Sequence, residues 1–340
     1  MANIPLDVAI IVVTTGLIWL GSGWLEGASE KLSAYYGLPE VVQGSIVTAI
    51  GSSFPELATV VVAAVTVGSL ELGVGAIVGS AIFNILVIPA LAGIATEDDI
   101  ESNRTLVYKE AQFYMLAVSV LVITFAMAVI YYRVPTAEHL SGEITRPLAM
   151  IPIGLYGLYI FIQYQDTAEH EADPEAGAGV DVLRQWGLLI AGLAVILIAV
   201  ERLVHSVDLI GTELGVPQFI MGVTIAAGAT SLPDALVSLR AARDDRGVAS
   251  LANVLGSNTF DLLVAIPVGV LIVGSAPINF SMAVPMFGVL TLATILLFTV
   301  LRTGLALSTV ESYVLLGSYL AFVAWVVLET VSDVVNYLPN

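Results

Sequence analysis

The stretch Gly51-Ser52-Ser53-Phe54-Pro55-Glu56 lies inside a long apolar segment, and a second stretch of the same kind, Ala229-Thr230-Ser231-Leu232-Pro233-Asp234, lies inside another. Each places two hydroxyls, a proline and a carboxylate where hydrocarbon-facing side chains are expected. A carboxylate at the centre of a bilayer costs about 3 kcal/mol even on the lenient insertion scale. A bound cation is the simplest compensation for that cost.

The composition sets the class of protein. The chain has 340 residues, of which 58% are hydrophobic and only 12% are charged. Soluble domains are about 25% charged, so an integral membrane protein is expected. The absence of cysteine excludes disulfides, thiolate metal sites and cysteine nucleophiles. The N-terminal residues lack a basic region and a small-residue cleavage site, so the first apolar run is expected to be a retained span.

The charge balance excludes one large class of partner. The chain carries 29 acidic and 11 basic residues. Nucleic-acid binding requires the opposite sign, so no nucleic-acid partner is expected. An excess of acids in aqueous loops is tolerated where salt screening is strong, which favours a halophilic source.

Apolar runs of about 20 residues, the length of a membrane span, recur along the chain. They fall near 7–28, 40–67, 73–95, 110–131, 147–164, 186–212, 217–240, 247–272, 279–301 and 311–331. The polar, acidic stretch 165–184 divides them five and five. We interpret it as a solvated linker, because a regulatory Ca2+ site would require the alternating ligand spacing of an EF-hand loop.

The basic residues predict the orientation in the membrane. With an external N-terminus, eight fall in cytoplasmic loops and three in outer loops. The cytoplasmic eight are Lys31, Arg104, Lys109, Arg184, Arg240, Arg243, Arg246 and Arg302, and the outer three are Arg133, Arg146 and Arg202. We therefore expect a multi-pass protein of the cell membrane with both termini outside and the linker inside.

The two halves are repeats of each other. Adding 178 takes Ser53 to Ser231 and Glu56 to Asp234, and adding 177 takes the block 79–84 (Gly-Ser-Ala-Ile-Phe-Asn) to the block 256–261 (Gly-Ser-Asn-Thr-Phe-Asp). An odd number of spans per half makes the second half enter from the opposite face. The sequence predicts an all-α polytopic membrane protein with ten transmembrane helices, arranged as two inverted five-helix repeats with broken helices at the midplane, a transporter design. The repeats cover 1–164 and 185–340.

The polar residues of the repeats offer only oxygen ligands. Each proline removes a backbone donor and is expected to free carbonyls near Ala49 and Ser52 in one copy and near Ala227 and Thr230 in the other. Hydroxyls and carboxylates or amides recur at helical spacing, and the pairs are Ser53 with Glu56, Ser231 with Asp234, Ser80 with Asn84, and Ser257 with Asp261. Such donors suit hard cations such as Ca2+ and Na+.

Single polar residues in membrane helices are more often interhelical contacts than ligands. The acids Glu56, Asp234 and Asp261 differ, because no lysine or arginine is near them in the sequence. Three such acids would cost roughly 9 kcal/mol, comparable with the stability of a whole domain. They must bind cations, pair across helices or stay protonated.

Both blocks resemble the alpha-repeats of the cation/calcium antiporter superfamily, which includes the sodium/calcium exchangers. Residues 44–93 and 220–270 carry the resemblance. It implies that Glu56 and Asp234 are the central Ca2+ ligands. It also implies Na+ and Ca2+ sites formed by Ser52, Ser53, Thr230, Ser231, the carbonyls of Ala49 and Ala227, and Ser80, Asn84, Ser257 and Asp261.

The sequence departs from the family pattern in several places. Ser52 and Phe54 stand where the family usually has threonine and leucine, and Asp234 stands where glutamate is commoner. The combination of Gly79-Ser80-Ala81, Pro233-Asp234 and Asp261 is similar to the potassium-dependent branch. Asp261 alone does not settle whether K+ is coupled to transport.

The function expected from these features is a Na+/Ca2+ antiporter that extrudes Ca2+ by alternating access. The first and sixth spans are expected to slide as a gate. The partners are the transported cations (Ca2+, Na+ and, in the potassium-dependent alternative, K+) and the lipid bilayer, and the expected functional unit is a monomer. Three alternatives stay open: Ca2+/H+ exchange on the same scaffold, a passive cation channel, and an intramembrane aspartyl hydrolase using Asp234 and Asp261.

Overall fold

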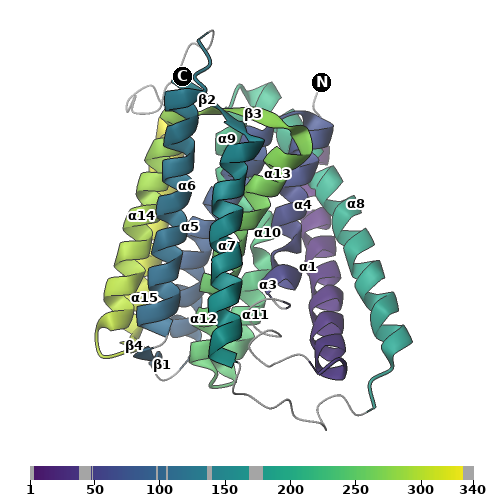
Figure 1. The fold of residues 1–340 in the computed structure, drawn as a ribbon, viewed down its shortest axis with the longest axis vertical. Coiled ribbons are helices and arrows are strands. Elements are labelled where there is room, and N and C mark those ends of the chain that lie inside the picture. Colours follow the sequence, from purple (N-terminus) through teal and green to yellow (C-terminus); the bar gives the residue numbers. More distant parts are fainter. Residues whose placement is uncertain are drawn as a thin grey trace.

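Nearly the whole of the described chain is helical (Figure 1). The computed structural model describes residues 4–37, 47, 49–96, 99–104, 106–135, 140–167 and 179–331. The helices of the first half are α1 (Ile4–Tyr35), α3 (Ala49–Ser52), α4 (Phe54–Val62), α5 (Leu70–Ala95), α6 (Ala111–Tyr131) and α7 (Arg146–Thr167). Those of the second half are α8 (Val182–Leu214), α9 (Gln218–Met221), α10 (Ala227–Thr230), α11 (Leu232–Arg243), α12 (Gly247–Phe260), α13 (Ile266–Val273), α14 (Phe280–Arg302) and α15 (Thr309–Val331).

Within the described ranges, four complete π-helical segments interrupt or extend these helices. They are η2 (Ala63–Val67), η3 (Leu106–Glu110), η4 (Gly222–Ala226) and η5 (Asp261–Ala265). Such segments are rare and often lie at functional sites. Two of them adjoin the polar residues of the second half: η4 leads into α10, which ends at Thr230, and η5 begins at Asp261, the last residue of the block 256–261.

The prediction of an all-helical, multi-pass membrane protein is confirmed. In the described part of the chain, eight helices are long and apolar enough to cross a membrane, or nine when the bent pair Gln218–Thr230 and Leu232–Arg243 is taken as one span. All ten predicted apolar runs fall on helices, although residues 40–46 and 48 of the second run lie outside the described residues. So does 168–178, most of the predicted linker.

The two polar phrases coincide with helix breaks. In the first, α3 ends at Ser52 and α4 begins at Phe54, with Pro55 in its first turn. In the second, α10 ends at Thr230 and α11 begins at Leu232, with Pro233 in its first turn, and the axis bends by 45°. Proline is tolerated in a first helical turn because its missing N–H would be unpaired there in any case.

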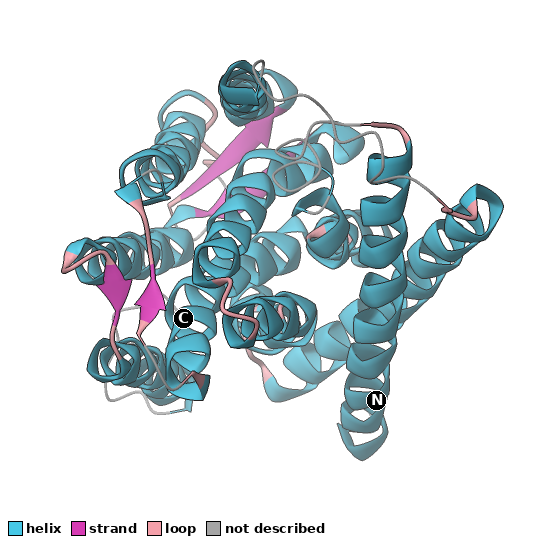
Figure 2. Ribbon diagram, turned by 90° about the horizontal axis from the view of Figure 1, so that it is seen from below, coloured by secondary structure: helices cyan, strands magenta, loops and turns pink. Residues whose placement is uncertain are grey.

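The core of the bundle is formed by α5 and α12, which bury their side chains on almost every side. The long helices α1 and α8 instead lie along each other at one edge of the bundle (Figures 1 and 2). Gly21 and Gly192 make this contact close, because a Cβ on Gly192 would lie 2.7 Å from the Gly21 carbonyl oxygen. Both helices expose broad apolar surfaces of the kind that face lipid.

Two short antiparallel sheets tie loops of the first half to loops of the second. At one end of the bundle β2 (Ser141–Thr145) pairs with β3 (Ser275–Asn279), and at the other β1 (Ile100–Glu101) pairs with β4 (Ala306–Leu307) (Figure 1). The sequence analysis predicted neither. The Glu71 carboxylate, at the start of α5, also accepts the N–H of Asn279 at 2.8 Å, so the core helix is bonded to the end of β3.

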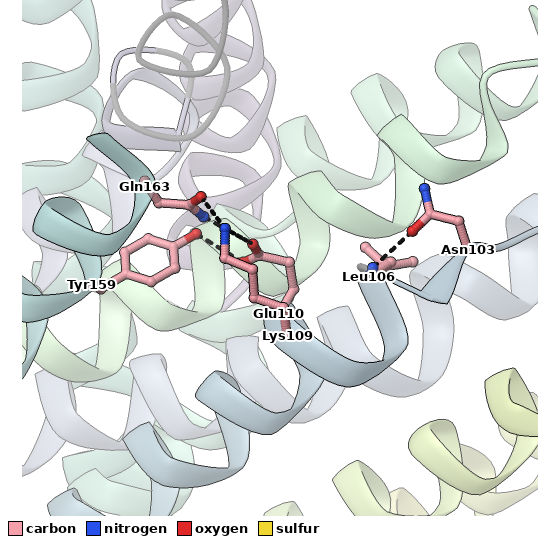
Figure 3. Close-up of polar contacts among 6 residues, drawn as sticks. All are labelled: Asn103, Leu106, Lys109, Glu110, Tyr159 and Gln163. Carbon is pink, nitrogen blue, oxygen red and sulfur yellow. Dashed lines mark hydrogen bonds and ion pairs between the residues drawn. The ribbon is translucent and has the colours of Figure 1, made fainter. Parts of the chain in front are cut away.

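A polar network holds α7 against the start of α6 (Figure 3). Gln163 accepts a hydrogen bond from Lys109 Nζ at 2.7 Å and donates one to Glu110 Oε1 at 2.8 Å. Tyr159 donates its hydroxyl to Glu110 Oε2 at 3.0 Å. The Asn103 side chain accepts the N–H of Leu106 at 2.8 Å, at the first turn of η3.

The broken helix of the second half packs on α5 through glycines. A Cβ on Gly75 would overlap the carbonyl oxygen of Phe219, and one on Gly222 would lie 2.7 Å from the backbone nitrogen of Ala76. Neither contact involves a flexible side chain that could give way. The backbones therefore approach closely only because these positions are glycine.

We predict that Gly75→Ala destabilises the protein by about 1–3 kcal/mol, because overpacking at a backbone contact forces the two helices apart. Thermal unfolding in detergent measures the effect. Gly288→Ala on α14 is the matched control, since a Cβ there meets nothing within 4 Å. Equal unfolding temperatures for the two variants would contradict the prediction.

Candidate cation site

The predicted ligand side chains come from four places in the fold, and all ten are at most 1% exposed. Two broken helices contribute the residues of the polar phrases, and two core helices contribute those of the Gly-Ser blocks. They are Ser52, Ser53 and Glu56 (α3 to α4), Thr230, Ser231 and Asp234 (α10 to α11), Ser80 and Asn84 (α5), and Ser257 and Asp261 (α12 to η5).

The two halves meet through equivalent hydroxyl contacts. Ser80 Oγ lies 2.6 Å from Ser231 Oγ. Ser53 Oγ donates to the carbonyl oxygen of Ser257 at 3.5 Å. Since Ser53 corresponds to Ser231 and Ser80 to Ser257 in the repeat, equivalent residue pairs meet in both places, once through two hydroxyls and once through a hydroxyl and a backbone carbonyl. Each joins a broken helix of one half to a core helix of the other.

The acidic contacts are also paired, but they are not alike. Asn84 Nδ2 donates to Asp234 Oδ2 at 3.2 Å. The equivalent positions are Asp261 and Glu56, which are both carboxylates, and the strongest Coulombic interaction of Glu56 is with Asp261. One pair is thus an amide hydrogen-bonded to a carboxylate. The other consists of two carboxylates that repel each other.

Six buried oxygens in this cluster have no hydrogen-bond partner among the described residues. They are both oxygens of Glu56, both of Asp261, Oδ1 of Asp234 and Oδ1 of Asn84. A buried acceptor left without a donor costs about 1–3 kcal/mol, and more if it is charged. Ca2+ takes about 6–8 oxygen ligands, so the chemistry of this set fits a hard cation.

The cluster differs from a compact all-acid metal site. Within the described residues, no three His, Cys, Asp or Glu side chains form a group that holds a metal ion by themselves. The donors are mixed, with hydroxyls and an amide lying between the acids. Ser52 and Ser257 lie beside the Asp234 carboxylate, and Ser53 lies beside that of Asp261.

The family described as sodium/calcium exchanger protein matches residues 6–165 and 184–328. The chain belongs to this family. It is therefore a cation/Ca2+ exchanger and a transporter, not an enzyme, and both the aspartyl hydrolase and the passive channel are excluded.

Solved structures share the fold of this exchanger. The sodium-calcium exchanger NCX_Mj, soaked with Na+ and Sr2+, is 25% identical, has a TM-score of 0.64, and the match covers 94% of this chain and 98% of that one. The H+/Ca2+ exchanger CAX has a TM-score of 0.73 at 17% identity, over 93% of this chain and 82% of that one.

Human sodium/potassium/calcium exchanger 4 is 46% identical over 66 residues, which are 19% of this chain and 11% of that protein.

One predicted ligand has a different environment from the one expected. The carbonyl of Ala227 is not freed by the proline, because it accepts the N–H of Ser231 at 3.0 Å and the hydroxyl of Thr230 at 3.4 Å. Proline removes the donor that would reach four residues back, which from Pro233 is Ala229. Ala49, its counterpart, is the first residue of α3.

The sequence analysis missed Asn258 of the exchanger, which is fully buried in α12. Its Oδ1 accepts from Asn84 Nδ2 at 3.0 Å, and its Nδ2 donates to the Ala81 carbonyl at 3.2 Å and to the Tyr114 hydroxyl at 3.4 Å. The signal was present in the repeat, because Asn258 corresponds to Ala81.

We predict that Asp261→Asn makes the exchanger more stable in cation-free buffer by about 1–3 kcal/mol, because it removes a buried charge that has no partner. Added Ca2+ will then stabilise the variant less than the parent protein. Thermal unfolding in chelator, with and without excess Ca2+, measures both effects. Asp244→Asn, which removes an exposed carboxylate 3.7 Å from Arg246, is the control and will change neither. Lower stability of Asp261→Asn in chelator would contradict the assignment.

Proposed function

We propose that this exchanger extrudes Ca2+ in exchange for Na+ by alternating access. The observation that carries the proposal is a set of buried oxygens on Glu56, Asp234, Asp261 and Asn84, where the two halves meet, that have no hydrogen-bond partner in the described part of the chain. Such a set is costly when empty and is stabilised by a hard cation.

The proposed transport site uses the ligands expected from the repeats. Glu56 and Asp234 coordinate either load, with Asn84 and Asp261 completing the cluster. Hydroxyls and carbonyls supply the neutral ligands: Ser52, Ser53, Ser80, Thr230, Ser231, Ser257, and the main chain at Ala49 and Ala227. The burial of the ten side chains and the contacts between the halves support this assignment.

We propose ten membrane spans in two inverted repeats, 1–164 and 185–340, joined by a cytoplasmic linker at 165–184. The start of α1 and the end of α15 lie at one end of the bundle, and the end of α7 and the start of α8 lie at the other (Figure 1). This supports an odd number of crossings in each half. The excess of basic residues on the linker side supports external termini.

Charge neutralisation supplies the coupling in this mechanism. When the site is loaded, its net charge is close to zero and the protein can change between its inward-facing and outward-facing states. When the site is empty, the bare carboxylates oppose this change. The helices α1 and α8 slide as the gate, since they pack chiefly on each other at the edge of the bundle. The monomer contains the whole site and is the proposed functional unit.

Na+ is the coupling ion in this proposal. The 25% identity with NCX_Mj over 94% of the chain supports Na+. Because a local stretch matches human sodium/potassium/calcium exchanger 4, the dependence of transport on K+ is measured together with its dependence on Na+. The experiment is 45Ca2+ uptake into proteoliposomes under imposed Na+, K+ or pH gradients. Uptake driven by a pH gradient without Na+ would replace the proposal with Ca2+/H+ exchange.

We predict that Glu56→Gln and Asp234→Asn each lower Na+-driven 45Ca2+ flux at least 100-fold, because the neutral amides remove the charge that a divalent cation requires. Glu71→Gln is the matched control: its amide oxygen still accepts the Asn279 N–H, and flux will stay within twofold of the parent protein. Near-normal flux in both site variants would refute the ligand assignment.

A further inference from the structure

Asn258 lies where the two repeats touch. It occupies the position that Ala81 holds in the first half, and its amide nitrogen donates to the carbonyl of that same Ala81 at 3.2 Å. Equivalent positions of the two halves are therefore in direct contact, and only one of them carries an amide. Asn258 is fully buried, and both ends of its side chain are hydrogen-bonded.

The hydrogen bonds of Asn258 leave only one orientation for its amide. The Ala81 carbonyl has no proton and acts only as an acceptor, so the NH2 group of Asn258 must face it. The Tyr114 hydroxyl takes a second bond from the same NH2 group. The oxygen of Asn258 is thereby directed to the opposite side, towards Asn84.

This orientation is passed on to Asn84. The amide nitrogen of Asn84 has two protons, and both are used, one on Asn258 Oδ1 at 3.0 Å and one on Asp234 Oδ2 at 3.2 Å. Its oxygen is left without a partner among the described residues. A flipped Asn84 would set its oxygen against two acceptors and turn its NH2 group, which repels cations, towards the site.

We propose that Asn258 is a positioning residue that fixes the Asn84 amide with its oxygen towards the transported cation. The inference rests on the proposed role of Asn84 as a ligand. Asn258 does not itself touch the cation. It acts through the orientation of Asn84, with Tyr114 and the Ala81 carbonyl holding its own amide in place.

The repeat explains why only one of the two halves has such a positioning residue. Asp261, the counterpart of Asn84, has two equivalent oxygens and needs no orientation. Ala81, the counterpart of Asn258, provides none. An amide ligand offers a cation one attractive and one repulsive end, so it requires a partner that distinguishes them, and Asn258 meets that requirement.

The test is the KM for Ca2+ in 45Ca2+ exchange by the reconstituted full-length protein. Asn258→Ala will raise the KM about tenfold, the lower end of the effect of losing a partner that orients a metal ligand, with Vmax within twofold. Tyr114→Phe keeps the ring and removes only the hydroxyl, and will raise the KM about two- to threefold. Tyr114→Phe is nearly isosteric with the parent residue, so its KM still tests the proposal if Asn258→Ala folds poorly.

The control is Asn253→Ala on the same helix. Asn253 donates to Ser238 Oγ at 3.2 Å and so bonds α12 to a neighbouring helix, α11, but no hydrogen bond joins it to Asn84 among the described residues. If Asn258 only supports helix packing, both alanine variants will lower Vmax and the unfolding temperature and leave the KM unchanged. That result would overturn the proposal.

A double-mutant cycle distinguishes this inference from the ligand assignment beneath it. In an Asn84→Ala background, Asn258→Ala will change the KM by less than about twofold, because the side chain that it orients is gone. An equal tenfold effect in both backgrounds would refute the positioning role alone. A normal KM for Asn84→Ala itself would instead refute Asn84 as a ligand.

Discussion

Three carboxylates lie inside this protein with no lysine or arginine paired to them in the described part of the chain. Glu56, Asp234 and Asp261 are each at most 1% exposed, and five of their six oxygens lack a hydrogen-bond partner there. A buried charge without a partner costs several kcal/mol. In the proposed mechanism a bound cation restores neutrality, so the stability of the core and the transport of the cargo depend on the same interaction.

The duplication explains both the likeness and the difference of the two halves at this site. Equivalent serines meet twice, Ser80 with Ser231 through their hydroxyls and Ser53 with Ser257 through the backbone carbonyl of Ser257. The acidic positions have diverged, so that Asn84 binds Asp234 while Asp261 lies in the field of Glu56. A symmetric set would hold four carboxylates. Under the proposed function, replacing one with an amide lowers the charge that the cargo must neutralise, and it introduces the need to orient that amide.

The sequence could predict the helices and their breaks because both depend on local chemistry. Apolar runs set the spans, and Pro55 and Pro233 set the interruptions. The strands β1 to β4 were not predictable, since they are two to five residues long and pair across halves. Asn258 was missed because its role depends on a contact between equivalent helices, which spacing along one helix does not show. The expectation that Pro233 frees the Ala227 carbonyl was wrong, because the donor that this proline removes would have reached Ala229 and not Ala227.

The same sheets indicate which part of the protein is free to move under the proposed mechanism. The pairs β2–β3 and β1–β4 join the halves at opposite ends, so a shift among α5, α6, α7, α13, α14 and α15 would break backbone hydrogen bonds. The helices α1 and α8 carry no such strand. Besides each other, in the described chain α1 contacts α3, α4, α10 and α11, and α8 contacts α4, η2, α9 and η4. A movement of this pair along the core would therefore uncover the broken helices from one end while covering them from the other, without disturbing the sheets that hold the cation ligands in register.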